Sequence, residues 1–243
     1  MILIERGPRL SPVSWLFESL SKAAQHIDSI DASTSLDFIQ THRQLDSQII
    51  VIREGHITAV GRDVTVPPGA RVIDLSGYTV LPGLIDSHTH LTIDGKSQDP
   101  LTELEHTAAQ RAFGSLPNAR AVLLAGFTTV RDLGSYRALV DVALRDAINR
   151  GDVVGPRMLV AGAYVTITGG AGSVSVFAPD VTQPWDLRYG NANSATEVRE
   201  RIRALASQRV DVIKVFATGA ILTHNSNPAA REATPKGAFS GGG

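Results

Sequence analysis

The stretch Val80-Leu-Pro-Gly-Leu-Ile-Asp-Ser-His-Thr-His-Leu91 decides the fold of this 243-residue chain. Its apolar run predicts a strand, and His88 and His90 stand near the end of that run. Successive side chains of a strand point to opposite faces, so both imidazoles point the same way. Two neighbouring imidazole nitrogens can hold one metal ion. The alternative is a pair of unrelated strand histidines with separate hydrogen-bonding roles.

The composition is that of an ordinary soluble globular chain, with 43% hydrophobic and 19% charged residues. A net charge of −1 disfavours nucleic-acid binding, so we expect small, roughly neutral partners. The absence of cysteine removes disulfides and thiolate ligands, so any metal must be held by imidazole and oxygen. No apolar run is long enough for a bilayer, and the N-terminus carries no secretory signal. We therefore expect no membrane contact and a cytoplasmic location.

After His90, helix and strand patterns alternate, which favours a parallel sheet with crossover helices. The expected strands cover residues 128–131, 157–165 and 210–217. One helical segment is expected to open with a capping box at 102–105, to break before Pro117 and to end at Gly126. Further helices are expected after Ser135 and after the capping box at 194–197.

The flanks of this region have other patterns. Residues 1–45 match no known pattern, although apolar spacing over 14–30 predicts an amphipathic helix packed on the body of the protein. Residues 46–80 predict part of a small β domain, with a hairpin around Glu54-Gly55 and a short strand over 72–75. The tail, 225–243, has linker-like composition and is expected not to pack.

Lys214 and Asp132 are the other candidate site residues. An ammonium in the middle of the expected strand 210–217 would cost several kcal/mol if it were buried without a partner. The alternative is a structural role, in which Lys214 pairs with a buried carboxylate or extends past the strand end into solvent. Asp132, at the end of the expected second strand, can orient a ligand histidine, and structural pairing with an arginine is the equal alternative. Asp86, His224 and the glycine-rich loop 169–172 are interpreted as structural or surface features.

Five segments occur in the order found in one family: 80–91, 126–134, 155–158, 166–170 and 211–219. Together they resemble the amidohydrolase superfamily, in the branch of imidazolonepropionase-like enzymes, prolidase-type dipeptidases and ochratoxin-type amidases. The resemblance runs from about residue 49 to about residue 223.

The resemblance implies an α/β fold, namely the first half of a metal-dependent (β/α)8 TIM-like barrel preceded by part of a small β-sandwich domain. Residues 81–224 would form roughly the first four βα units, because a complete barrel needs about 250 residues. We therefore expect a fragment or a truncated product.

The resemblance also implies a site. His88 and His90 would ligate a divalent metal, and Lys214, carboxylated by carbon dioxide, would bridge it to a second metal. Zinc is favoured by the nitrogen and oxygen ligands. Asp132 would orient a ligand histidine without binding the metal itself. The proton-shuttling aspartate of the family has no counterpart here, so no catalytic residue is assigned, and Ala171 stands where many relatives carry histidine.

The implied reaction is hydrolysis of a carbon–nitrogen bond in an amide, lactam or dipeptide-like substrate by metal-activated hydroxide. The alternative is a non-catalytic fragment that binds metal weakly or associates through its open barrel edge, including with its own copies.

Overall fold

The computed structural model describes residues 2–5, 47–75, 79–93, 102–174, 177–178, 180–220 and 229. The predicted helix over 14–30 lies outside these residues, as does almost all of the predicted tail. The chain divides into two compact units, Met1–Leu84 and Ile85–Gly243.

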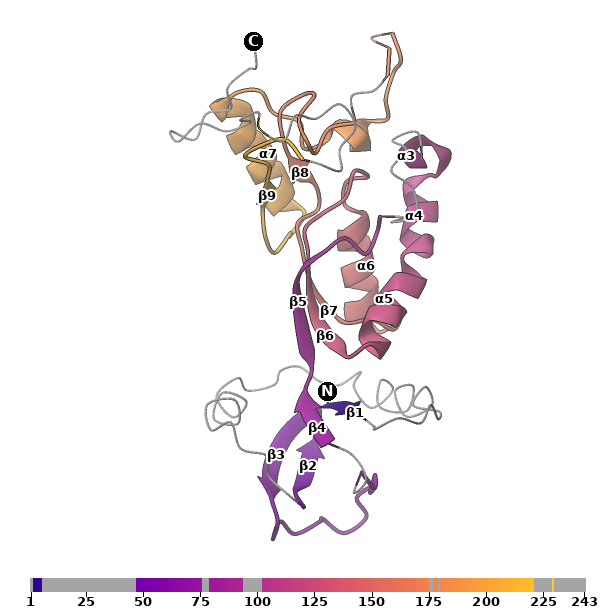
Figure 1. Cartoon of the computed structure of the whole chain (residues 1–243), viewed down its shortest axis with the longest axis vertical. Helices are drawn as coiled ribbons and strands as arrows, with labels where there is room; N and C mark the ends of the chain where they lie inside the picture. The colour runs from indigo at the N-terminus through magenta and orange to yellow at the C-terminus, as the bar shows by residue number, and fades with distance from the viewer. Residues whose placement is uncertain are drawn as a thin grey trace. The chain divides into compact units, whose positions relative to one another are not determined.

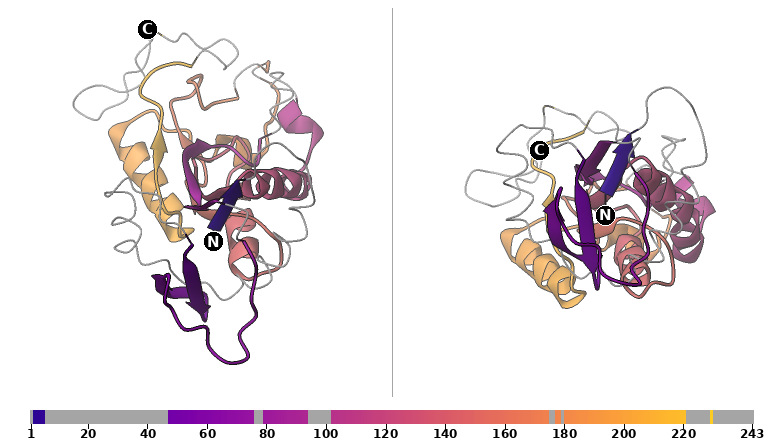
Figure 2. Two further views of the ribbon diagram at one scale, coloured as in Figure 1. Left: turned by 60° about the horizontal axis from the view of Figure 1, so that its bottom comes forward. Right: turned by 90° about the horizontal axis from the view of Figure 1, so that it is seen from below.

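The first unit contains two antiparallel strand pairs. They are β1 (Ile2–Glu5) with β4 (Thr79–Pro82), and β2 (Ile49–Arg53) with β3 (His56–Gly61) (Figure 2). The predicted hairpin is confirmed, because β2 and β3 are joined by Glu54 and Gly55, with φ of 49° and 79°. Positive φ at both central residues suits the twist of a two-residue hairpin turn.

The strand expected over 72–75 is wrong, since the structure has irregular backbone there. Val72 is 73% exposed, so this segment has no sheet face on which to bury its apolar side chain. That the two strand pairs form part of a sandwich stays a prediction.

The second unit alternates strands with helices (Figure 1). Strands β5 (Leu84–Thr89), β6 (Phe127–Asp132) and β7 (Arg157–Val160) form one sheet in that order, and β6 runs parallel to β7. Strands β8 (Tyr164–Val165) and β9 (Lys214–Val215) form a second parallel pair. The parallel arrangement is confirmed, whereas closure into half a barrel stays a prediction.

Helices connect these strands. Between β5 and β6 lie α3 (Thr102–Glu105), α4 (Ala108–Gly114) and α5 (Leu116–Leu124), and α6 (Val140–Asn149) lies between β6 and β7. The segment between β8 and β9 holds the short 3-10 helix η1 (Trp185–Arg188) and α7 (Ala195–Ser207).

One face of the three-stranded sheet is covered by helices. Val130, Met158 and Val160 point from the strands into a core that also contains Leu144 of α6 and Ala119 of α5. Alternate strand residues point the other way, so Arg131 and Leu159 are exposed. A smaller core lies between α7 and β8, formed by Ala138, Ala163, Val165 and Leu205.

The capping box expected at 102–105 is wrong in position. It lies at the start of α4, where the Thr107 hydroxyl accepts from the Gln110 N–H at 3.2 Å and the Gln110 side chain accepts from the Thr107 N–H at 2.8 Å. Residues 102–105 instead form the separate short helix α3, whose Glu103 turns inward and pairs with Arg111 at 3.4 Å. The predicted break before Pro117 is confirmed by the division between α4 and α5.

Ser135 does not cap the next helix. Its hydroxyl donates to the Arg137 carbonyl at 2.6 Å, and α6 begins only at Val140, after Leu139 adopts a φ of 68°. The cap at Ser194 is confirmed, because its hydroxyl accepts from the Glu197 N–H at 3.2 Å. The expected strand over 157–165 divides into β7 and β8, and the strand expected over 210–217 shortens to β9.

Candidate metal centre

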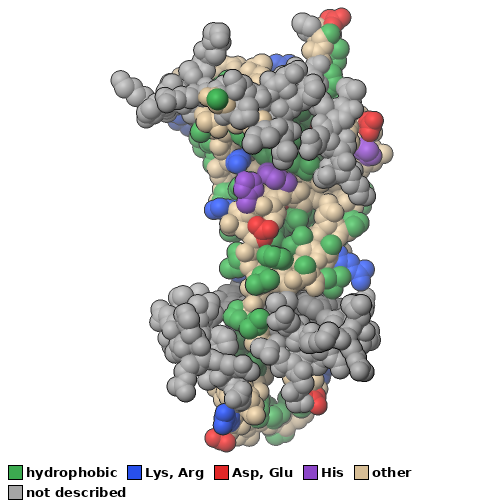
Figure 3. Space-filling view, in the orientation of Figure 1, with side chains coloured by type: hydrophobic (Ala, Val, Ile, Leu, Met, Phe, Trp, Pro, Cys, Tyr) green, Lys and Arg blue, Asp and Glu red, His purple; other side chains and the backbone are tan. Residues whose placement is uncertain are grey.

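His88 and His90 lie together at the end of β5. Their ring centroids are 5.3 Å apart, with an angle of 72° between the ring planes. The backbone N–H of His88 donates to Asp86 at 2.9 Å, so Asp86 supports the strand end locally. Histidine side chains gather on the face drawn in Figure 3, with lysine or arginine atoms beside them. The expected common orientation of the two imidazoles agrees with this ring contact.

His90 is held through its Nδ1 atom, which lies 2.8 Å from the Gly134 carbonyl oxygen. A carbonyl oxygen only accepts hydrogen bonds, so Nδ1 carries the proton and Nε2 presents a lone pair. Burial is the largest cause that lowers the pKa of His90. The Gly134 contact opposes it, and the charges of His88 and Lys214 lower the pKa further. The lowered pKa and the Nδ1 contact both favour the neutral imidazole, the form that binds metal ions.

Lys214 reaches the same region through the pairing of β8 with β9, in which Tyr164 and Lys214 are register partners. The Tyr164 ring packs edge-on against His90 at 5.7 Å and against Phe216 at 5.3 Å. The Lys214 ammonium lies 4.9 Å from the centre of the Phe216 ring, a favourable place for a cation. The structure thus brings the three predicted ligands to one neighbourhood: His88 lies on β5, His90 follows its last residue, and Lys214 lies on β9.

Asp132 is fully buried behind this neighbourhood. Its two carboxylate oxygens accept from the Leu91 N–H at 2.6 Å and from the Gly134 N–H at 3.1 Å. Burial, followed by the charge of Asp141, raises the pKa of Asp132 to about 7. Asp132 therefore fixes the residue that follows His90 and the residue whose carbonyl holds the His90 ring. It acts on that ring through the backbone.

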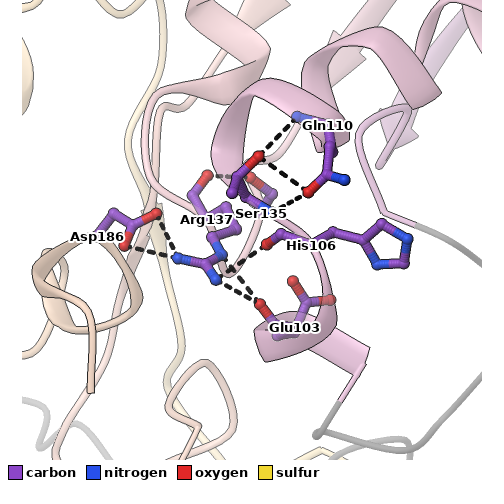
Figure 4. A network of polar contacts seen from close by, with 7 residues as sticks. Glu103, His106, Gln110, Ser135, Arg137 and Asp186 are labelled. Atoms are coloured by element: carbon purple, nitrogen blue, oxygen red, sulfur yellow. Dashed lines mark hydrogen bonds and ion pairs between the residues drawn. The ribbon is translucent and has the colours of Figure 1, made fainter. Parts of the chain in front are cut away.

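An arginine network that the sequence did not indicate joins three segments beside the site (Figure 4). The Arg137 guanidinium donates to both carboxylate oxygens of Asp186, at 2.9 and 3.0 Å, and to the carbonyl oxygens of Glu103 and His106. These partners lie 31 to 49 residues away in the chain, so no local pattern reveals them. The network fixes the loop after β6 to α3 and to η1.

The donor set fits part of a metal site. In the described part of the chain, no three His, Cys, Asp or Glu side chains are grouped so that they could hold a metal ion. Two neighbouring imidazoles, with a free Nε2 on His90, suit a divalent cation, and Lys214 could add oxygen ligands only after carboxylation. The two imidazoles could therefore serve as the first two ligands of a metal ion, and the remaining ligands would have to come from other groups.

A model of the amidohydrolase family matches residues 79–239. The chain belongs to the amidohydrolase family. It is 28% identical to ochratoxinase of Aspergillus niger over 210 residues, which are 79% of this chain and 42% of that protein. It is 42% identical to imidazolonepropionase of Klebsiella pneumoniae over 64 residues, which are 26% of this chain and 16% of that protein.

Among solved structures, this amidohydrolase chain is similar to a Xaa-Pro dipeptidase with bound methionine in its active site. The TM-score is 0.63 and the identity 30%, with 73% of this chain and 44% of the dipeptidase covered. All three relatives are named as enzymes, and the predicted family and branch are confirmed. The chain spans less than half the length of each of them.

Among the residues described, no helix combines the length and the apolar character needed to cross a membrane.

Proposed function

We propose that this chain supplies the first metal-binding part of a hydrolase site that acts on carbon–nitrogen bonds of small amide, lactam or dipeptide-like molecules. The observation that carries the proposal is the pairing of His88 with His90, whose Nε2 is left free by the Gly134 contact. The names of the relatives, an ochratoxinase, an imidazolonepropionase and a Xaa-Pro dipeptidase, support this substrate class.

In this proposal His88 and His90 hold a divalent cation, with zinc favoured by nitrogen and oxygen ligands in a chain without cysteine. Such a cation acidifies water and polarises the scissile carbonyl. Asp132 holds the backbone at Leu91 and Gly134, so that the His90 ring keeps its orientation. Residues 81–224 then form the first part of the barrel, and 46–80 form part of the small β domain.

Lys214 would join the site as a carbamate. The ammonium first gives one proton to solvent. The neutral amine then attacks the carbon of carbon dioxide, a nitrogen–carbon bond forms as one carbon–oxygen π bond breaks, and a second proton leaves to solvent. The product is an anion with two oxygens, suited to bridge a pair of metal ions. Because the ammonium now lies over the Phe216 ring, carboxylation exchanges a cation–π contact for metal ligation.

Metal content of the purified 243-residue chain tests the proposal. After dialysis against zinc and bicarbonate, we expect the wild-type chain to retain zinc and the His88→Ala/His90→Ala double variant to lose most of it. His56→Ala, which removes an imidazole in the other unit, is the matched control and should retain wild-type metal. Equal zinc content in the wild type and the double variant would overturn the assignment of the ligands.

Lys214 is tested in the same assay. Lys214→Ala should weaken zinc retention further than Lys214→Glu, because glutamate restores an oxygen anion at the position of the carbamate. Equal retention by both variants would argue that Lys214 is a structural lysine.

A second candidate function is association without catalysis. Apolar side chains are exposed on the described strands, with Ile85 70% and Leu159 40% exposed, and uncovered apolar strand surface favours contact with another chain or another copy. Sedimentation velocity and amide-hydrolase assays with and without a chelator separate the two candidates. Self-association with no chelator-sensitive hydrolysis would favour this second function.

A further inference from the structure

We infer that Tyr164 is a positioning residue for His90: its hydroxyl oxygen shares the Nδ1 proton of His90 with the Gly134 carbonyl and holds the imidazole with Nε2 free. Only the consequence for metal affinity rests on the proposed function. The hydrogen-bond arrangement itself is a property of the metal-free chain.

The geometry of Nδ1 carries the inference. The Gly134 carbonyl oxygen lies 2.8 Å from this atom, and the Tyr164 hydroxyl oxygen lies 3.2 Å from it. Because the carbonyl requires a proton on Nδ1, the more distant hydroxyl oxygen becomes a second acceptor of the same proton. Two acceptors limit the rotation of the ring more than one does, and acceptors behind a ligand histidine raise its basicity toward a metal.

The surroundings of Tyr164 fix its hydroxyl in place. The residue is 6% exposed, and its ring makes edge contacts with Tyr136 and Phe216, each at 5.3 Å between centroids. Gly172 and Gly190 bring two further backbone segments against it. A Cβ on Gly172 would lie 2.6 Å from the Cβ of Tyr164, and a Cβ on Gly190 would overlap the Tyr164 carbonyl oxygen. The phenol is therefore held from several sides and cannot follow a rotating imidazole.

Tyr164 also connects His90 to the strand that carries Lys214. Its backbone pairs with Lys214 in the register of β8 and β9, while its side chain contacts His90. Tyr164 thus couples the position of His90, just after β5, to the position of Lys214 on β9. Because its hydroxyl reaches Nδ1, which faces away from the lone pair on Nε2, Tyr164 acts through His90 rather than on substrate.

The test compares Tyr164→Phe with the wild type and with Tyr136→Phe. Both variants keep an aromatic ring and remove one hydroxyl, so packing is nearly conserved. In metal-free protein labelled with 15N-histidine, we expect the His90 Nδ1–H resonance to shift and its exchange with solvent to accelerate in Tyr164→Phe. Tyr136→Phe should leave both unchanged. A variant of His90 assigns the resonance.

Zinc titration of the same proteins gives the second readout. We expect Tyr164→Phe to weaken zinc binding by about tenfold, the low end for partners behind a ligand, because the Gly134 contact remains. An unchanged Nδ1–H resonance in Tyr164→Phe would overturn the inference, as would a wild-type His90 that carries its proton on Nε2. If instead the wild type binds no zinc while the resonance shifts as expected, the proposed function fails and the positioning role of Tyr164 stands.

Discussion

Replacing Asp132 with asparagine should flatten the pH dependence of the free energy of unfolding. Asp132 is fully buried, and its pKa is raised from 3.8 to about 7, first by burial and then by the charge of Asp141. The folded chain therefore binds this proton more tightly than the unfolded chain does. The resulting stability is fully present below pH 3.8 and is lost as the pH rises through about 7. At 1.36 kcal/mol per pKa unit, the loss is about 4 kcal/mol.

The asparagine side chain in the Asp132→Asn variant does not titrate. The free energy of unfolding of this variant therefore does not fall between pH 3.8 and about pH 7 for this reason. Its amide can accept from only one of the two backbone N–H groups, of Leu91 and Gly134, that the carboxyl group holds. The group left unsatisfied costs about 1–3 kcal/mol. At pH 5 the wild type has already lost about 2 of these 4 kcal/mol, so the two proteins should differ in stability by no more than about 1 kcal/mol. By pH 8 the variant should be the more stable protein, by about 1–3 kcal/mol.

Urea unfolding followed by circular dichroism, at intervals from pH 4.5 to pH 8, measures this difference. Asp152→Asn is the matched control, because Asp152 is an exposed aspartate paired with Arg150 at 2.9 Å. Its curve should run parallel to the wild-type curve. Parallel curves for Asp132→Asn and the wild type would refute the reasoning, since they would mean that Asp132 has the same proton affinity in the folded and unfolded chains.

Two further predictions concern packing around the site. Arg137→Met should lower the unfolding free energy by about 3–5 kcal/mol, because it leaves the carboxylate of Asp186 buried without its partner; a urea midpoint equal to that of the wild type would contradict this. Gly190→Ala should abolish the close approach to the Tyr164 carbonyl and sharply reduce the yield of folded chain, whereas Gly114→Ala, with open space around it, should not. Equal yields from both glycine variants would show that the segment can move aside.

Much of the fold was predictable because the responsible signals are local. The hairpin depends on two adjacent residues with positive φ, and the break before Pro117 depends on the proline itself. The errors arose where a local signal had a competitor. Thr102 and Thr107 both offer a cap followed by a suitable side chain three residues later, and the inward turn of Glu103 toward Arg111 decided between them.

In the candidate site, too, some features follow from the local sequence and others only from the tertiary structure. The sequence by itself determined that His88 and His90 share a strand face, since the period of a strand is set by its backbone. Only the tertiary structure decided what holds them. Gly134, Asp132 and Tyr164 contact His90 or its backbone neighbours from 41 to 74 residues away, and Asp186 meets Arg137 across 49 residues. Contacts over such separations depend on how the strands and loops pack. Such packing produces no periodic pattern in the sequence from which the contacts could be predicted.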